Sequence, residues 1–133
     1  MAAAYESGVV DLSFKVKAGS DLSAKQYFIL ELTAEDEVDV ANAATDVPLG
    51  ILQNKPKAGE QAQVRMLGVS KVVVNAAGLA AGDRWGTDAA GRAIAKTADK
   101  DWTGGRCLTT AGATQGLQAT VTVQTLLPAT LSV

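Results

Sequence analysis

Three apolar runs with two breaks between them, all within residues 47–75, limit what this chain can fold into more than any other feature. The first break carries Pro56, whose fixed φ suits a tight turn, and Gly59, which tolerates a positive φ. The second run alternates apolar and polar residues, which is the period of a strand with one buried face. Gly68 separates it from the third run, residues 69–74, whose end is apolar on both faces. We therefore predict a meander of three consecutive strands, around which the other strands pack.

Other parts of the chain also have strand patterns. Apolar and polar residues alternate cleanly in residues 9–17, and residues 26–33 are apolar enough for a central strand. Further strands are predicted at residues 35–40 and 117–125. No segment shows a long helical period, so we predict one mainly β domain over residues 9–133. At most one or two short helical turns are expected. Residues 41–46 are predicted to be a loop or a single helical turn, and residues 79–83 are able to form one short helical turn.

Two predicted turns share one chemistry. Residues 75–78 and 88–91 both begin with Asn or Asp and end with Gly, which is typical of a type I turn capped by its first side chain. Residues 84–87 and 92–95 are predicted to form a hairpin around the second turn. Two remaining segments are expected to be irregular: the polar loop 97–105, which contains Trp102, and the tail 130–133.

The charge balance argues against a nucleic-acid partner, and the lengths of the apolar runs argue against a membrane-spanning segment. The net charge is −2 and the pI is about 5.0, whereas a nucleic-acid surface needs clustered Lys and Arg. No apolar run is long enough to span a bilayer, and no signal-peptide pattern opens the chain. Hydrophobic residues make up 47% of the chain but aromatic residues only 5%, so the core must consist of Val, Leu, Ile and Ala.

Groups suited to catalysis or metal binding are few. The chain has no histidine, which removes the commonest general base and metal ligand. Cys107 is the only cysteine, so it forms no intrachain disulfide, and we interpret it as a small buried hydrophobe. Asp99 and Asp101 lack the spacing of an EF-hand. An enzyme would have to rely on a carboxylate pair such as Asp83 and Asp88. We expect no enzymatic activity, no cofactor and no metal.

Two further groups of side chains have ordinary structural explanations. Trp85 and Trp102 are expected to pack in the core or at its rim. The acidic cluster is expected to be a solvated strand edge, although it is also able to bind a basic partner; it comprises Glu35, Asp36, Glu37 and Asp39.

Residues 1–8 are predicted to be an N-terminal arm without a fold of its own, because they are mostly small and end at Gly8. Two interpretations stay open at this point. The arm is either a disordered terminus or a segment that orders on a partner, with Tyr5 as its anchor.

The order and spacing of several motifs resemble those of capsid decoration proteins of tailed bacteriophages, also called cement or head-stabilising proteins. The resemblance covers about two thirds of the chain, from roughly Val47 to the C-terminus. The matching motifs are Gly50-Ile51-Leu52, then Gly59-Glu60 followed by Val64, the Gly78 to Asp83 turn and the Asp88 to Gly91 turn. The N-terminal third matches only in character, as a small-residue arm followed by an alternating strand.

The resemblance implies a small β-barrel or β-tulip domain that binds the outer surface of the assembled phage head. Its expected partners are the major capsid protein and itself, as a homotrimer at threefold and quasi-threefold positions. The expected location is the outer capsid surface of the virion, after synthesis in the host cytoplasm. Residues expected to contact the capsid or a neighbouring subunit are Ala2, Ala3, Ala4, Tyr5, Glu6, Val9 and Val10.

A second class of function remains as the alternative, namely a secreted or surface β-barrel module that binds a ligand such as a carbohydrate. Such a module needs exposed aromatic side chains around a groove. The chain has two Trp, two Tyr and two Phe, and Phe14 and Phe28 lie within strand patterns. The aromatic content therefore favours the decoration protein.

Overall fold

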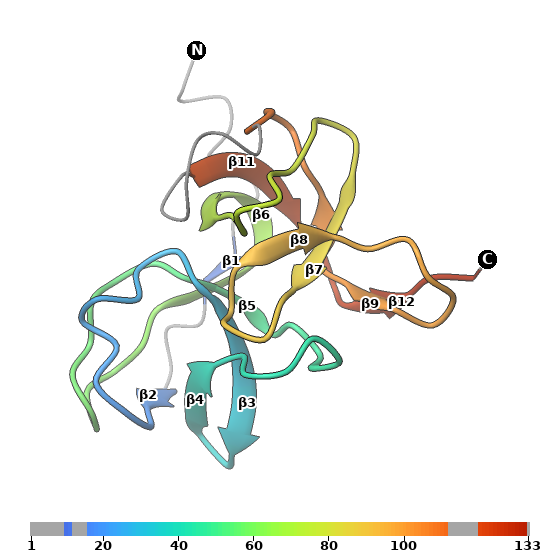
Figure 1. Ribbon diagram of the computed structural model, residues 1–133. Coiled ribbons are helices and arrows are strands. Elements are labelled where there is room, and N and C mark those ends of the chain that lie inside the picture. Colours follow the sequence, from blue (N-terminus) through green and yellow to red (C-terminus); the bar gives the residue numbers. More distant parts are fainter. Residues whose placement is uncertain (1–9, 12–15, 112–119, 133) are drawn as a thin grey trace.

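The computed structural model describes residues 10–11, 16–111 and 120–132, and all regular elements in this part are strands (Figure 1). This confirms the predicted mainly β class. In chain order the strands are β1 (Val10–Asp11), β2 (Lys17–Ala18), β3 (Ile29–Ala34), β4 (Glu37–Val40), β5 (Gly50–Leu52), β6 (Val64–Val73), β7 (Arg84–Thr87), β8 (Ala93–Ala95), β9 (Trp102–Thr103), β10 (Gly105–Arg106), β11 (Thr120–Thr125) and β12 (Ala129–Thr130).

The main sheet has seven strands in the order β1-β6-β5-β3-β4-β2, with β11 also paired to β6. It curls into half a barrel and stays open. β6, with ten residues, is shared by the two parts of this sheet, one formed with β1 and β5 and the other with β11. Residues up to Leu67 pair with β1 and β5, and residues from Gly68 to Val73 pair with β11.

The prediction that Gly68 ends one strand and begins another is wrong. Gly68 has φ 123°, which only glycine adopts readily, so the chain bends there while the strand continues. The predicted meander of three strands is therefore two antiparallel strands, β5 and β6, the second of which changes partners at the bend. The expected burial on both faces near its end is confirmed, because Val72, Val73 and Val74 are all buried.

Two buried clusters fill the space on either side of β3 and β5. Ile29 and Ile51 belong to one cluster, and their chain neighbours Leu30 and Leu52 belong to the other. Successive side chains of a strand point to opposite faces, so these two strands are covered on both sides. This burial confirms that the apolar segment 26–33 contains a central strand. β3 begins at Ile29 because the preceding residues form a turn, in which Phe28 N–H donates to the Lys25 carbonyl.

The hairpin of β7 and β8 is confirmed, with Trp85 opposite Ala95 and Thr87 opposite Ala93. β10 pairs with the other edge of β7 and completes a three-stranded sheet. The prediction of an irregular loop at residues 97–105 is wrong, since this segment contains β9 and the first residue of β10. Among the described residues of the predicted tail, Thr130 belongs to a strand, β12, and residues 131–132 are irregular as predicted. β12 pairs with β9 in a ribbon at the side of the molecule that carries the C-terminus (Figure 1).

Of the two alternatives predicted for residues 41–46, the structure has the loop, in which the Asp46 N–H donates to the Ala43 carbonyl. The short helical turn predicted at residues 79–83 is not observed. In residues 79–83, Leu79 makes a β-bridge with Ala111 instead, and the chain then turns so that Asp83 N–H donates to the Ala80 carbonyl. Non-local pairing at Leu79 thus replaces the local hydrogen bonds of a helix. In the described part, no helix is long and apolar enough to cross a membrane.

The segment 9–17 was predicted as one strand, and its two described ends pair with different strands. Val10 and Asp11 pair with β6, whereas Lys17 begins a short parallel pairing with β4. The alternation is confirmed at its end, where Val16 is buried and Lys17 is exposed. Residues 12–15 lie outside the described residues, as does the arm 1–8, so the division of the chain into arm and domain stays a prediction.

Candidate interaction surface

The side chains considered for catalysis have structural roles in the described part. Asp83 accepts a hydrogen bond from Ala80 N–H at 3.0 Å. Asp88 accepts hydrogen bonds from the N–H groups of Ala90 and Arg92, both at 2.8 Å, and a third from the Asn75 side chain. The two carboxylates therefore cap separate turns, and Asp88 also connects the two predicted type I turns to each other.

Cys107 is buried, which confirms its interpretation as a small hydrophobe. Burial raises the pKa of its thiol, and its Sγ donates to the Thr109 carbonyl at 2.8 Å. Asp101 accepts from Ala98 N–H at 3.1 Å in a local turn. Among residues 10–11, 16–111 and 120–132, no group of three or more His, Cys, Asp or Glu side chains is placed to hold a metal ion.

The two tryptophans lie at different depths, as expected for core and rim packing. Trp85 is 1% exposed, and its Nε1–H donates to the Gln124 carbonyl at 2.8 Å. Gly104 lies so close to the Trp85 ring that a Cβ there would be 2.2 Å from ring carbon Cη2. Trp102 is half-buried in β9. Trp85 thus joins β7 and β11 to the glycine pair at the start of β10, Gly104 and Gly105, and it does not line an open surface.

The acidic hairpin of β3 and β4 is a solvated edge at its tip, where Glu35 and Asp36 are exposed. Asp36 has φ 55°, which makes the turn. Behind the tip, Glu31 and Asp46 lie together and both accept from Asn42 N–H, at 3.2 and 2.9 Å. Burial, the hydrogen bond with Asp46 and its charge raise the pKa of Glu31. Burial alone would raise the pKa of Asp46, but the hydrogen bonds from Glu31, Asn42 and Ala43 have the opposite effect and are together larger. The pKa of Asp46 is therefore lowered.

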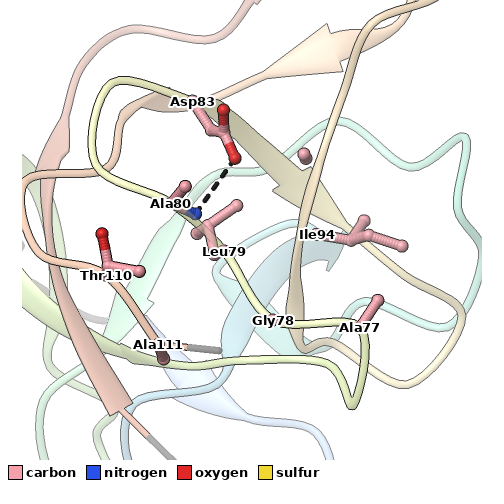
Figure 2. A pocket seen from close by; sticks show the side chains of 9 residues that line it. Ala77, Gly78, Leu79, Ala80, Asp83, Ile94, Thr110 and Ala111 are labelled. Atoms are coloured by element: carbon pink, nitrogen blue, oxygen red, sulfur yellow. Dashed lines mark hydrogen bonds between the residues drawn. The ribbon is translucent and has the colours of Figure 1, made fainter. Parts of the chain in front are cut away.

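One surface pocket of about 330 Å³ lies between three segments that are distant in sequence (Figure 2). The turn of residues 77–80 crosses it, with Thr110 and Ala111 on one side and Ile94 on the other. Most of the lining side chains are apolar and small. The pocket is therefore suited to an apolar group of another molecule.

The pocket has few free polar groups. The dashed line in Figure 2 marks the hydrogen bond that occupies an Asp83 oxygen. The Thr110 hydroxyl oxygen accepts from Ala81 N–H at 3.1 Å. Sequence reasoning missed this pocket, because its walls are brought together by two non-local bridges, Leu79 with Ala111 and Val74 with Ala93.

Several large apolar side chains are exposed in the described part: Leu32, Val47, Leu108, Leu126 and Leu127. Leu127 is 67% exposed and Leu126 is 50% exposed. These two are consecutive, and they lie in the connection between β11 and β12. Single exposed apolar side chains are common on protein surfaces, whereas adjacent ones form a contiguous apolar patch that is often part of an interaction site.

Of the predicted contact residues, the structure describes only Val10, which lies opposite Leu67 at the edge of β6. The others lie outside the described residues, so their role stays a prediction: Ala2, Ala3, Ala4, Tyr5, Glu6 and Val9.

No protein-family profile and no curated protein matches the sequence. Among solved structures, the chain is similar to the crystal structure of the head fiber gp8.5 N base of bacteriophage phi29. The TM-score is 0.65, the sequence identity is 20%, and the match covers 87% of this chain and 94% of that chain. At this identity, the likeness shows a shared fold.

Proposed function

We propose that this chain is a structural protein of a tailed-phage head that binds the outer surface of the assembled shell as a trimer and stabilises it. The observation that carries the proposal is the likeness in fold to the phi29 head fiber base over nearly the whole of that chain. Fold alone does not decide function, so the motif resemblance at residues 50–52, 78–83 and 88–91 is the second support.

The stabilising effect would follow from linkage. A protein that binds the assembled lattice, and not its separate subunits, stabilises the lattice by its binding free energy. Three copies joined in a trimer add avidity, because binding of one copy raises the effective concentration of the others near their sites. The proposal covers both a trimer formed in solution and one that forms only on the shell.

The N-terminal arm is proposed to reach the shell or a neighbouring subunit. β1 pairs with β6 through Val10 and Asp11, so the arm would leave from the edge of the main sheet. Eight extended residues reach at most ~28 Å. The proposed contact residues are those of the sequence prediction, with Tyr5 as a large amphipathic anchor at low entropic cost.

A second candidate function is the base of a head fiber, which anchors a longer fiber to the shell. The name of the phi29 structure favours it. Both candidates place the chain on the outside of a head, and they differ in whether a further fiber is attached. The carbohydrate-type module gains no support from the pocket, because none of its lining residues is aromatic.

The proposal is tested with phage heads assembled without this chain. Purified protein is added to them, the heads are sedimented, and the temperature at which they release DNA is compared with and without the protein. We expect the chain to sediment with the heads and to raise that temperature. Failure of the chain to sediment with intact heads would overturn the proposal.

A further inference from the structure

We propose that Lys25 and Arg92, which lie over the ring of Phe28, form a binding site for an acidic segment of a partner protein. Lys25 Nζ is 4.7 Å from the centroid of this ring, and Arg92 Cζ is 5.5 Å from it. Lys25 lies in the turn before β3 and Arg92 directly before β8, so only the fold brings the two charges to one ring. This site is separate from the proposed binding to phage heads, and neither depends on the other.

The two cations lack negative partners within the described part of the chain, where no carboxylate forms an ion pair with Lys25 or Arg92. Asp88 is the carboxylate nearest to Arg92 along the chain, and both of its oxygens accept hydrogen bonds within the turn or from Asn75. Arg92 Nε is buried and has no hydrogen-bond partner among the described residues. Buried polar atoms without partners are rare, and they are most costly on charged groups. An anion beside this guanidinium would offset part of that cost.

The Phe28 ring holds both charges in place, because the face of an aromatic ring attracts a cation. Phe28 is 3% exposed, so its ring is a fixed part of the interior. Its N–H donates to the Lys25 carbonyl at 3.0 Å, and the Arg92 N–H donates to Asp88 at 2.8 Å. Side chains that are already positioned lose little conformational freedom on binding, so more of the attraction to an anion appears as affinity.

A third cation lies beside the next ring along the chain, since Lys71 Nζ is 5.8 Å from the centroid of the Tyr27 ring. Tyr27 has φ 70°, which is uncommon for an aromatic residue. Two hydrogen bonds hold it there: its N–H donates to the Leu52 carbonyl at 2.8 Å, and its carbonyl accepts from Val73 N–H at 3.0 Å. Backbone outliers of this kind concentrate at binding sites. The strained turn therefore places two rings that carry cations next to each other.

The available donors favour a carboxylate over a phosphate. Phosphate sites in proteins commonly use free backbone N–H groups. Here the nearby N–H groups all donate within the chain, namely those of Tyr27, Phe28, Ile29 and Arg92. An anion would therefore meet only side-chain charges. Nucleic acid is a poor partner as well, because the chain has a net charge of −2 and the basic site is small.

The spacing of the two charges suits an extended acidic segment. Two cations over one ring cannot be farther apart than the sum of their distances to its centroid. Carboxylates on alternate residues of an extended chain lie on one face, about 7 Å apart, which is within that limit. One such pair of carboxylates can therefore contact Lys25 and Arg92 together.

The test is a titration of the full chain with a short synthetic peptide in which Glu alternates with Thr, followed by NMR chemical shifts at low salt. A second peptide has Gln in place of every Glu and is otherwise identical. We expect the Glu peptide to shift the amide signals of residues 25–28 and 92, and the Gln peptide to bind at least tenfold more weakly. Added salt should weaken binding of the Glu peptide, because exposed charges are screened.

Lys25→Gln and Arg92→Gln should each raise the dissociation constant of the Glu peptide about threefold, and the double variant about tenfold. The matched control is Lys100→Gln, which removes the same charge from an exposed position in the turn before β9 and should leave the dissociation constant unchanged. Thermal melting checks that each variant is folded. If Arg92→Gln lowers the folded fraction, Lys25→Gln and its comparison with Lys100→Gln decide the result.

Equal binding of the Glu and Gln peptides, or binding of neither, would overturn the inference, as would an equal loss from Lys100→Gln. Single-stranded DNA that binds more tightly than the Glu peptide, with the same dependence on Lys25 and Arg92, would overturn the choice of an acidic protein segment. These titrations use the free chain. A negative result therefore leaves the proposed binding to phage heads in place, and failure to bind heads leaves this site in place.

Discussion

Replacing Trp85 by Phe tests whether one side chain connects the small sheet to the main one. The change removes the hydrogen bond from Nε1 to the Gln124 carbonyl and leaves that carbonyl without this donor, which costs about 1–3 kcal/mol. The smaller ring also leaves a void beside Gly104, where the fit is tight, at about 1–2 kcal/mol. We expect the free energy of unfolding to fall by about 2–5 kcal/mol, a large part of a typical total of about 5–15 kcal/mol.

Urea denaturation followed by far-UV circular dichroism measures this loss, with an unchanged m-value showing that only stability has changed. Trp102→Phe is the matched control, because Trp102 is half-buried in the outer ribbon. We expect it to cost less than about 1 kcal/mol. Equal losses for the two variants would refute the role assigned to Trp85.

Three further predictions concern the turns, the acidic loop and the arm. Asp88→Ala removes the carboxylate that joins the two turns and should lower the free energy of unfolding, measured in urea, by about 1–3 kcal/mol. Asp21→Ala removes a carboxylate that accepts from the Ser23 N–H, and it should lower the free energy of unfolding by less. The pKa of Glu31 is raised in the folded state, so ionisation of its carboxyl group opposes folding as the pH rises above 4.5. In thermal melts, Glu31→Gln should therefore leave the stability unchanged near pH 3 and increase it by roughly 0.5 kcal/mol at pH 7. Lower stability of this variant at pH 7 would contradict the prediction. Deleting residues 2–8 should leave the melting temperature of the free protein unchanged and weaken retention on heated heads; a large loss of melting temperature would instead place the arm in the core.

Local patterns predicted much of the fold because their causes are local. Alternation located β4 and β11, apolar content located β3, and the Asp-x-x-Gly sequence at residues 88–91 located the hairpin turn. In that turn Gly91 has φ 77°, the conformation that makes glycine favourable there. The buried position of Cys107 was also predictable, since a lone cysteine without a histidine partner most often packs as a hydrophobe.

The errors come from pairing between distant segments. Gly68 looks like a strand end, but β11 takes over as partner where β5 and β1 finish, so the strand continues. β9 and β12 have two residues each, too few for a recognisable period, and only their mutual pairing makes them strands. The pocket has the same origin, because its walls come from three segments of the chain.

The exposed leucines show a related limit. The sequence predicts that the strand ends at Thr125 and that Leu126, Leu127 and Pro128 break its register, but only the structure shows that both leucines are exposed. A pattern of apolar residues predicts burial, but not whether the burial occurs within the chain or against another molecule.

The central claim, binding to a phage head, is tested most directly by electron cryomicroscopy of heads with and without this chain. The account predicts extra density on the outer surface at threefold and quasi-threefold positions, into which three copies of the half-barrel domain fit around each axis. Absence of extra density on heads saturated with the protein, or density confined to sites without threefold symmetry, would contradict it.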